Sequence, residues 1–180
     1  MDVRITALVD ILRLNTRLFR NCLDGFTDAQ AAVRPGPGMN SAAFVAAHLA
    51  DSRFYLLKML GAEPENPLAR YLASARSIDE LEEWPSIAET LSAWADVSHA
   101  LRDRLDVMTA AELDEVTGPR FGMENPTRLN VLAFLVQHDS YHIGQLSLLR
   151  RHAGLPAMSY RRRSLSRDRT SSPQLPGGHS

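Results

Sequence analysis

One segment, from about residue 127 to residue 152, limits the possible folds more than any other stretch of the chain. Its predicted inward positions step along the segment by four, three, four, three and four, and they are Val131, Leu135, His138, His142, Gln145 and Leu149. This spacing follows one face of an α-helix. Gly154 is a typical C-terminal stop, and Pro156 lies just beyond it. We therefore predict a long amphipathic helix, which needs other elements to cover its inward face.

Three further segments show the same helical period: residues 3–23, residues 40–60 and residues 86–108. In none of them do polar and apolar residues alternate as they do in a half-buried strand. Helices that each bury one face are stable when they pack against one another. The sequence therefore predicts an all-α fold, a four-helix bundle.

Several polar residues mark expected helix starts. Asn40 or Ser41 can cap the second long helix, and Ser86-Ile87-Ala88-Glu89 has the spacing of a capping box at the start of the third. Thr109-Ala110-Ala111-Glu112 has the same spacing and predicts a short helical turn. Ser77-Ile78-Asp79-Glu80 does too, so we expect a short helix there.

The chain is expected to form one domain and a tail. Residues 1–156 carry all four helical segments and are assigned to the bundle, with a long, proline-containing connection at residues 62–85 between the second and third helices. Residues 157–180 are rich in Arg, Ser, Pro and Gly and show no periodicity. Because such a segment buries little apolar surface, we expect a flexible tail.

Composition excludes some classes of function. The formal net charge is −1, and the last 24 residues hold five arginines against one aspartate, so the rest of the chain is acidic at −5. An acidic body without a basic face argues against nucleic-acid binding. No apolar run approaches the roughly 20 residues of a membrane helix. We therefore expect a small-molecule substrate rather than nucleic acid or a membrane as the partner.

The single cysteine, Cys22, excludes an internal disulfide and favours the cytoplasm. Cys22 lies on the predicted inward face of the first helix, where a packed core residue is expected rather than a nucleophile. Lys58 is the only lysine among the twenty basic residues. This bias toward arginine, together with the many alanines, indicates a GC-rich bacterial genome.

Three histidines are candidate functional residues. His138 and His142 are four residues apart on one helix, so both imidazoles leave the same face. His48 lies on the predicted inward line of the second helix, with Phe44, Tyr55, Leu56 and Met59. Two interpretations remain open. The three can be core histidines with hydrogen-bond partners, or they can be three ligands of one metal ion with an open position.

Two further residues are candidate binding residues that support these histidines. Asp51 is one helical turn from His48, and Gln145 follows His142 by three residues on the same face. Ligating histidines usually donate their second N–H to a carboxylate or carbonyl oxygen. Asp139 lies one residue away from the predicted line and is expected to be a surface charge.

The stretch from His138 to Gln145, followed by Leu148-Leu149-Arg150-Arg151 and Gly154-Leu155-Pro156, resembles the closing motif of the DinB/YfiT-like family of metal-dependent four-helix bundles, a bacillithiol-transferase-like superfamily. Asn40 to Leu49 is similar to the segment that carries the first ligand of that family. The resemblance covers nearly all of residues 1–156.

This resemblance implies that His48, His138 and His142 hold a divalent ion, zinc or nickel, near one end of the core. It also implies a homodimer and, for some members, thiol S-transfer with a low-molecular-weight thiol such as bacillithiol as co-substrate. Phe44 stands at a position where relatives often have tryptophan, which changes the pocket wall and leaves the ligands in place.

The functional prediction is therefore a metal-dependent thiol S-transferase. Two alternatives are carried beside it: a non-catalytic, metal-binding or stress-related bundle protein, and a metal-dependent hydrolase that uses bound water. No residue of the sequence can be assigned as the general base.

Overall fold

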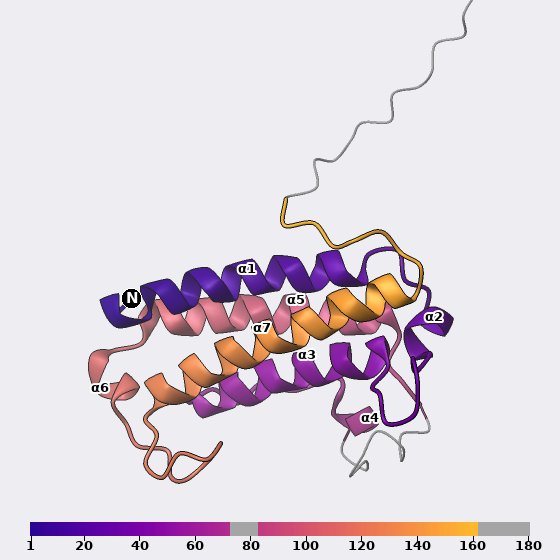
Figure 1. Cartoon of the computed structure of the whole chain (residues 1–180). Helices are drawn as coiled ribbons and strands as arrows, with labels where there is room; N and C mark the ends of the chain where they lie inside the picture. Colours follow the sequence, from indigo (N-terminus) through magenta and orange to yellow (C-terminus); the bar gives the residue numbers. More distant parts are fainter. Residues whose placement is uncertain (73–82, 162–180) are drawn as a thin grey trace, which may run out of the picture.

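Four long helices lie side by side in the computed structural model, which describes residues 1–72 and 83–161 (Figure 1). They are α1 (Thr6–Leu23), α3 (Ala42–Met59), α5 (Ile87–Val107) and α7 (Arg128–His152). A short 3-10 turn, η1 (Val3–Ile5), precedes α1. The described residues contain no strand, only two isolated bridges. The predicted all-α four-helix bundle is confirmed.

Each long helix has two long neighbours. α1 packs against α5 and α7, and α3 packs against the same two helices. The arrangement is a square in which α1 is diagonal to α3 and α5 is diagonal to α7. Because α3 and α7 are direct neighbours, side chains from the second and fourth predicted helices can meet.

Side-chain caps fix the starts of these helices. Ser41 accepts a hydrogen bond from the backbone N–H of Phe44 at 3.2 Å, and Ser86 and Glu89 form a complete capping box. Both starts agree with the sequence-based prediction. The N-cap of α7 is Thr127, whose box partner is an asparagine three residues later. Such caps satisfy backbone N–H groups that have no partner inside the helix.

Three short helices join the long ones: α2 (Asp28–Ala32), α4 (Ala69–Leu72) and α6 (Ala110–Leu113). The capping box that starts α6 was predicted from the sequence and is confirmed. α2 was not predicted, although Thr27 and Gln30 form a capping box there as well. α4 lies in the long connection between α3 and α5, and the helix expected at residues 77–80 lies outside the described residues.

The predicted inward lines of α3 and α7 agree with the structure in part, because Val131, Leu135 and Leu149 are buried as expected. On α7 the deeply buried residues include Leu132, Val136, Asp139, Ile143 and Leu146, whereas His138 and His142 are only half-buried. On α3 the buried line is rich in alanine, and His48 lies beside it. The three histidines lie at the edge of the interface between α3 and α7, on half-buried rather than fully buried positions.

The first residues of the predicted tail lie against α1 and form hydrogen bonds with it. Asn21 donates to the backbone oxygen of Ser159 at 2.7 Å, and Arg17 donates to that of Tyr160 at 3.3 Å. Residues 162–180 lie outside the described part of the chain, so the flexible tail and the domain boundary at residue 156 stay predictions. Among the described helices, none has the length and apolar character needed to cross a membrane.

Candidate metal centre

Three imidazole rings from two neighbouring helices converge on one point. Nε2 of His48, from α3, lies 3.2 Å from Nε2 of His138, from α7. Nε2 of His142, one turn further along α7, lies 3.1 Å from the same atom. The ring planes are inclined to one another by 67° to 77°. The structure therefore brings together the three histidines that the sequence singled out.

The spacing of these nitrogen atoms fits a shared divalent ion. One ligand atom from each histidine lies within 4.8 Å of the other two. Zinc binds imidazole nitrogen at about 2.0–2.1 Å, so two tetrahedral nitrogen ligands are roughly 3.3 Å apart. Nε2 of His138 carries at most one proton, so without an ion it can donate a hydrogen bond to only one of the two neighbouring nitrogen atoms. The donor set and its spacing thus suit zinc or a similar cation.

Burial keeps two of the rings in the form that binds metals. Burial, with a smaller contribution from the nearby His142, lowers the pKa of His48 to about 4. Burial likewise lowers the pKa of His138 to about 4, with smaller contributions from His142 and His48. Both rings are therefore neutral at pH 7. A neutral imidazole has the free electron pair that a metal ligand needs.

Gln145 orients one of the three rings. Nδ1 of His142 donates a hydrogen bond to Oε1 of Gln145 at 2.6 Å. With the proton on Nδ1, the lone pair is on Nε2 and points into the cluster. His138 has no such support, because its Nδ1 atom is buried and finds no hydrogen-bond partner in the part of the chain that the structure describes.

Asp51 has a different partner. Nδ2 of Asn66 donates to its carboxylate at 2.7 Å, and burial raises the pKa of the carboxyl above its usual range. No hydrogen bond found among the described residues joins Asp51 to His48. The structure therefore links Asp51 to the connection after α3 rather than to the imidazole.

Asp139 is a correction to the sequence-based expectation. It is 2% exposed rather than a surface charge. Its carboxylate accepts hydrogen bonds at 2.9 and 2.8 Å from Nε and Nη2 of Arg53, which is 1% exposed. Arg53 also donates to the hydroxyls of Thr16 and Ser98 at 2.7 and 2.6 Å. Asp139 directly follows His138 in the sequence, and its ion pair with Arg53 is the feature that sequence reasoning missed.

The same pair joins all four long helices. The guanidinium of Arg53 lies 3.5 Å from the centre of the Trp94 ring on α5. Thr16 belongs to α1, Asp139 to α7 and Arg53 to α3. A buried charge of this kind needs partners on every side. The ion pair consequently fixes the rotation of α7 next to His138.

Cys22 is packed in the core as expected. It is fully buried, and burial raises the pKa of its thiol to about 11. Its Sγ contacts the backbone oxygen of Ile143 at 3.7 Å. A protonated, inaccessible thiol is neither a nucleophile nor a metal ligand.

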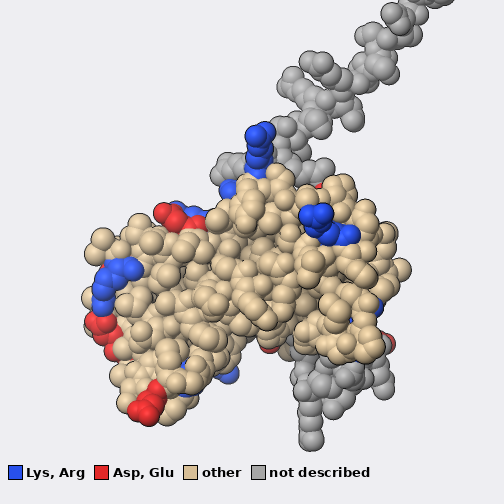
Figure 2. Space-filling model, viewed as in Figure 1, with Lys and Arg blue, Asp and Glu red and all other residues tan. Residues whose placement is uncertain are grey.

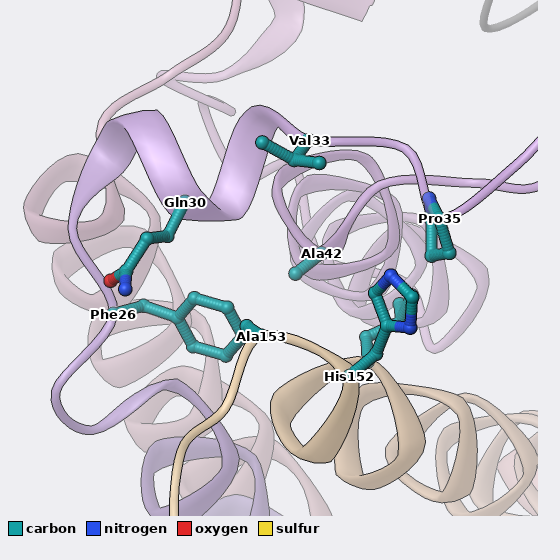
Figure 3. A pocket seen from close by; sticks show the side chains of 8 residues that line it. Phe26, Gln30, Val33, Pro35, Ala42, His152 and Ala153 are labelled. Atoms are coloured by element: carbon teal, nitrogen blue, oxygen red, sulfur yellow. The ribbon is translucent and has the colours of Figure 1, made fainter.

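A cavity near the N-terminus of α3 and the C-terminus of α7 is separate from the histidine cluster (Figure 3). Its volume is about 150 Å³, and it shares no lining residue with the cluster. Gln30 and His152 are its polar side chains, and the remaining wall is apolar, with Phe26 facing Ala153 in Figure 3. The small volume and sparse polar lining give no sign of a catalytic site.

Comparison with solved structures shows the same fold in other proteins. A conserved protein from Enterococcus faecalis matches with a TM-score of 0.68 and 20% identity, over 85% of this chain and 98% of that one. A DinB-like protein from Bacillus cereus matches with a TM-score of 0.68 and 22% identity, over 86% and 96%.

A third solved structure is YfiT from Bacillus subtilis, described as a probable metal-dependent hydrolase with an unusual four-helix bundle topology. It matches with a TM-score of 0.63 and 18% identity, over 83% of this chain and 87% of that one. At such identities the likeness shows the fold. The comparison with curated proteins found no significant match.

The family model of the DinB superfamily matches residues 11–146, which contain the four long helices almost entirely and all three clustered histidines. The predicted resemblance is confirmed, and the chain belongs to the DinB superfamily.

Proposed function

We propose that this protein is a metal-dependent enzyme, with His48, His138 and His142 as ligands of a zinc or nickel ion and with thiol S-transfer as its reaction. The observation that carries the proposal is the convergence of three Nε2 atoms at the edge of the core. Among the described residues, no carboxylate or thiol joins this group. A site with three protein ligands leaves a position for a further molecule, as catalytic zinc sites do.

A bound divalent ion lowers the pKa of a thiol that coordinates it, so that the thiolate is present at neutral pH. The side chains of the protein prepare the site for this. His48 and His138 are neutral, and Gln145 holds His142 in the ligating tautomer. Phe44 stacks beside His48 with ring centres 6.0 Å apart.

A metal-dependent hydrolase is the second candidate, and the structural likeness to YfiT supports it. Hydrolysis at a metal ion is assisted by a general base, for example a carboxylate, that takes a proton from water. Asp139 is engaged by Arg53, and Asp51 is engaged by Asn66. The hydrogen bonds of these two carboxylates therefore favour thiol transfer.

A non-catalytic protein is the third candidate. A structural zinc site is closed by a fourth protein ligand. The histidine cluster has three members in the described part of the chain, which favours an open site.

Metal analysis of purified wild type and His138→Ala tests the proposal, with His99→Ala as a matched control. His99 is an exposed histidine on α5 that pairs with Asp103. We expect one equivalent of metal in the wild type and His99→Ala, and a large loss in His138→Ala. Equal, negligible metal in all three would overturn the site.

A panel of low-molecular-weight thiols with a chromogenic electrophile then tests the reaction. We expect thiol-dependent turnover that requires the metal and is lost in His138→Ala. Full metal occupancy without such turnover would support the metal site and contradict the proposed thiol S-transfer. Hydrolysis of a chromogenic ester or amide by the same metal-loaded sample would favour the second candidate.

We also propose a homodimer that uses the exposed side of α7. Tyr141 and Leu148 are exposed and seven residues apart, so they lie on one face of the helix. The central part of the surface over α7 carries no charged side chain in the view of Figure 2. We expect a solution mass of twice the chain's 20.0 kDa, and a monomer for Leu148→Arg but not for Val107→Arg. The cytoplasmic location stays a prediction from the sequence.

A further inference from the structure

Three aromatic side chains continue outward from the histidine cluster, and we call them the aromatic wall: Tyr55 on α3, Phe121 in the loop before α7, and Phe134 on α7. The Phe134 and His138 ring centres are 6.2 Å apart. Phe121 stacks on Phe134 with ring centres 4.2 Å apart and planes inclined by 11°. Tyr55 meets Phe121 edge to face at 6.0 Å. The wall therefore leads from solvent to a proposed metal ligand.

The wall is unusually accessible for a cluster of large aromatic rings. Phe121 is 40% exposed and Tyr55 is 37% exposed. Stacking partners that serve only the core are buried in this protein: Phe19 and Trp94, whose ring centres are 4.0 Å apart, are fully buried. Exposed aromatic surface beside a polar cluster is a common property of ligand sites.

Phe121 is held in its place by a turn that disfavours phenylalanine. Arg120 and Met123 exchange backbone hydrogen bonds at 3.0 and 2.9 Å, so Phe121 and Gly122 are the two central residues of a tight hairpin. Their φ angles are 53° and 76°. Phe121 is the only residue other than glycine with positive φ among the described residues. Asn-Gly is the common pair in this type of turn, because asparagine tolerates the left-handed region.

The hairpin is also attached to α3 by a residue outside the wall. Nη1 of Arg120 donates to the hydroxyl of Tyr55 at 3.0 Å and contacts Sδ of Met59 at 2.9 Å. These contacts do not involve the Phe121 ring. A change at Phe121 therefore removes the ring and leaves the attachment of the hairpin in place.

We propose that the aromatic wall binds a flat aromatic group of a ligand whose polar end lies at the histidine cluster, with Phe121 as the residue that determines this specificity. The proposal rests on the proposed metal site. Aromatic rings favour offset-stacked and edge-to-face contacts with other aromatic rings, and the exposed parts of Phe121 and Tyr55 offer both. Residues in sparsely populated backbone conformations cluster at ligand-binding and active sites, so the positive φ of Phe121 points to a function of its side chain.

Two hydroxamates test the proposal through binding rather than turnover. Benzohydroxamate and acetohydroxamate carry the same metal-chelating head and differ in a phenyl against a methyl group. Their affinities for the zinc-loaded full chain are measured by calorimetry for wild type, Phe121→Asn, Phe121→Leu and the control Val107→Asn. Val107 is an exposed apolar residue at the end of α5. Thermal unfolding followed by circular dichroism checks the fold of each variant.

We expect the wild type and Val107→Asn to bind benzohydroxamate about tenfold more tightly than acetohydroxamate. The preference should fall at least about threefold in Phe121→Asn, with Phe121→Leu between the two. Phe121→Asn should unfold at the same or a higher temperature, because asparagine suits the turn. Acetohydroxamate should bind all four proteins equally well.

Two results would contradict different parts of the account. If both hydroxamates bind and their affinity ratio is unchanged in Phe121→Asn and Phe121→Leu, the aromatic specificity is overturned while the metal site stands. If the wild type retains no zinc and binds neither compound, the proposed metal site itself is overturned, and the specificity with it.

Discussion

The ion pair of Arg53 and Asp139 places two full charges in the core one residue away from a proposed metal ligand. Removing one partner leaves the other charge buried without compensation, which typically lowers the free energy of unfolding by about 3–5 kcal/mol. We therefore expect Arg53→Met to show such a loss in urea unfolding. Arg13→Met is the control, because Arg13 is exposed and contacts Asp10 at 3.4 Å. Equal stability of Arg53→Met and the control would contradict the role of the pair.

Gln145 is expected to support the proposed metal site through the His142 ring that it orients. Loss of a hydrogen-bond partner of a ligating histidine typically lowers metal affinity by about 10–100-fold. We expect Gln145→Ala to bind zinc at least about tenfold more weakly in competition with a chelator, with an unchanged apo stability. Gln137→Ala, on an exposed position of α7, should match the wild type. A wild-type zinc affinity in Gln145→Ala would show that this contact does not support the ligand.

Cys22 is expected to be unreactive in the folded protein. Because burial raises the pKa of its thiol to about 11, the thiol stays protonated at pH 8 and is also inaccessible. An aromatic disulfide reagent at pH 8 should label less than roughly a tenth of the native protein within minutes, as expected for a buried thiol. The same reagent should label all of the protein in denaturing urea. Rapid labelling of the native protein would contradict this packing and admit Cys22 as a thiol of the reaction.

At the scale of elements, the start of α3 sets the position of His48 along the helix. The side chain of Ser41 is fully buried and accepts a hydrogen bond from the backbone N–H of Phe44, which has no partner inside the helix. We expect Ser41→Ala to lower the free energy of unfolding by about 1 kcal/mol in urea. Ser92→Ala, on the exposed side of α5, should change it little. A stable Ser41→Ala would show that Asn40 or water replaces the cap.

Helix type and helix starts could be predicted because they depend on local chemistry. Ser41, the Ser86 box and the Thr109 box satisfy backbone groups within four residues of sequence, so their spacing is visible in the chain. The same signal was present at Thr27 and Gln30 and would have identified α2.

The rotation of each helix could not be read from apolar residues alone. On α3 the deeply buried line includes Ala46, Ala50 and Arg53, none of which is a large apolar residue. On α7 it includes Asp139, whose burial depends on Arg53 from another helix. Neighbouring positions on a helix are turned by roughly 100°, so the half-buried histidines lie beside these residues, and apolar spacing alone did not distinguish the two sets of positions.

At the scale of the whole molecule, the histidine cluster depends on which helices are neighbours. His138 and His142 are on one helix, so their spacing is visible in the sequence, whereas the approach of His48 depends on α3 lying next to α7. The hairpin that carries Phe121 is equally non-local, because its ring is placed by Phe134 and Tyr55 on two different helices. Sequence spacing therefore placed two of the clustered histidines together directly, and the third only in combination with the fold.

X-ray absorption spectroscopy of the zinc-loaded protein tests the central claim most directly. We predict a first shell with three nitrogen ligands at about 2.0–2.1 Å and the outer-shell signature of imidazole. His48→Ala, His138→Ala and His142→Ala should each remove one imidazole from the shell or abolish zinc binding, and His99→Ala should leave the spectrum unchanged. A first shell that contains sulfur at about 2.3 Å, or that lacks imidazole, would contradict a metal centre built from these three histidines.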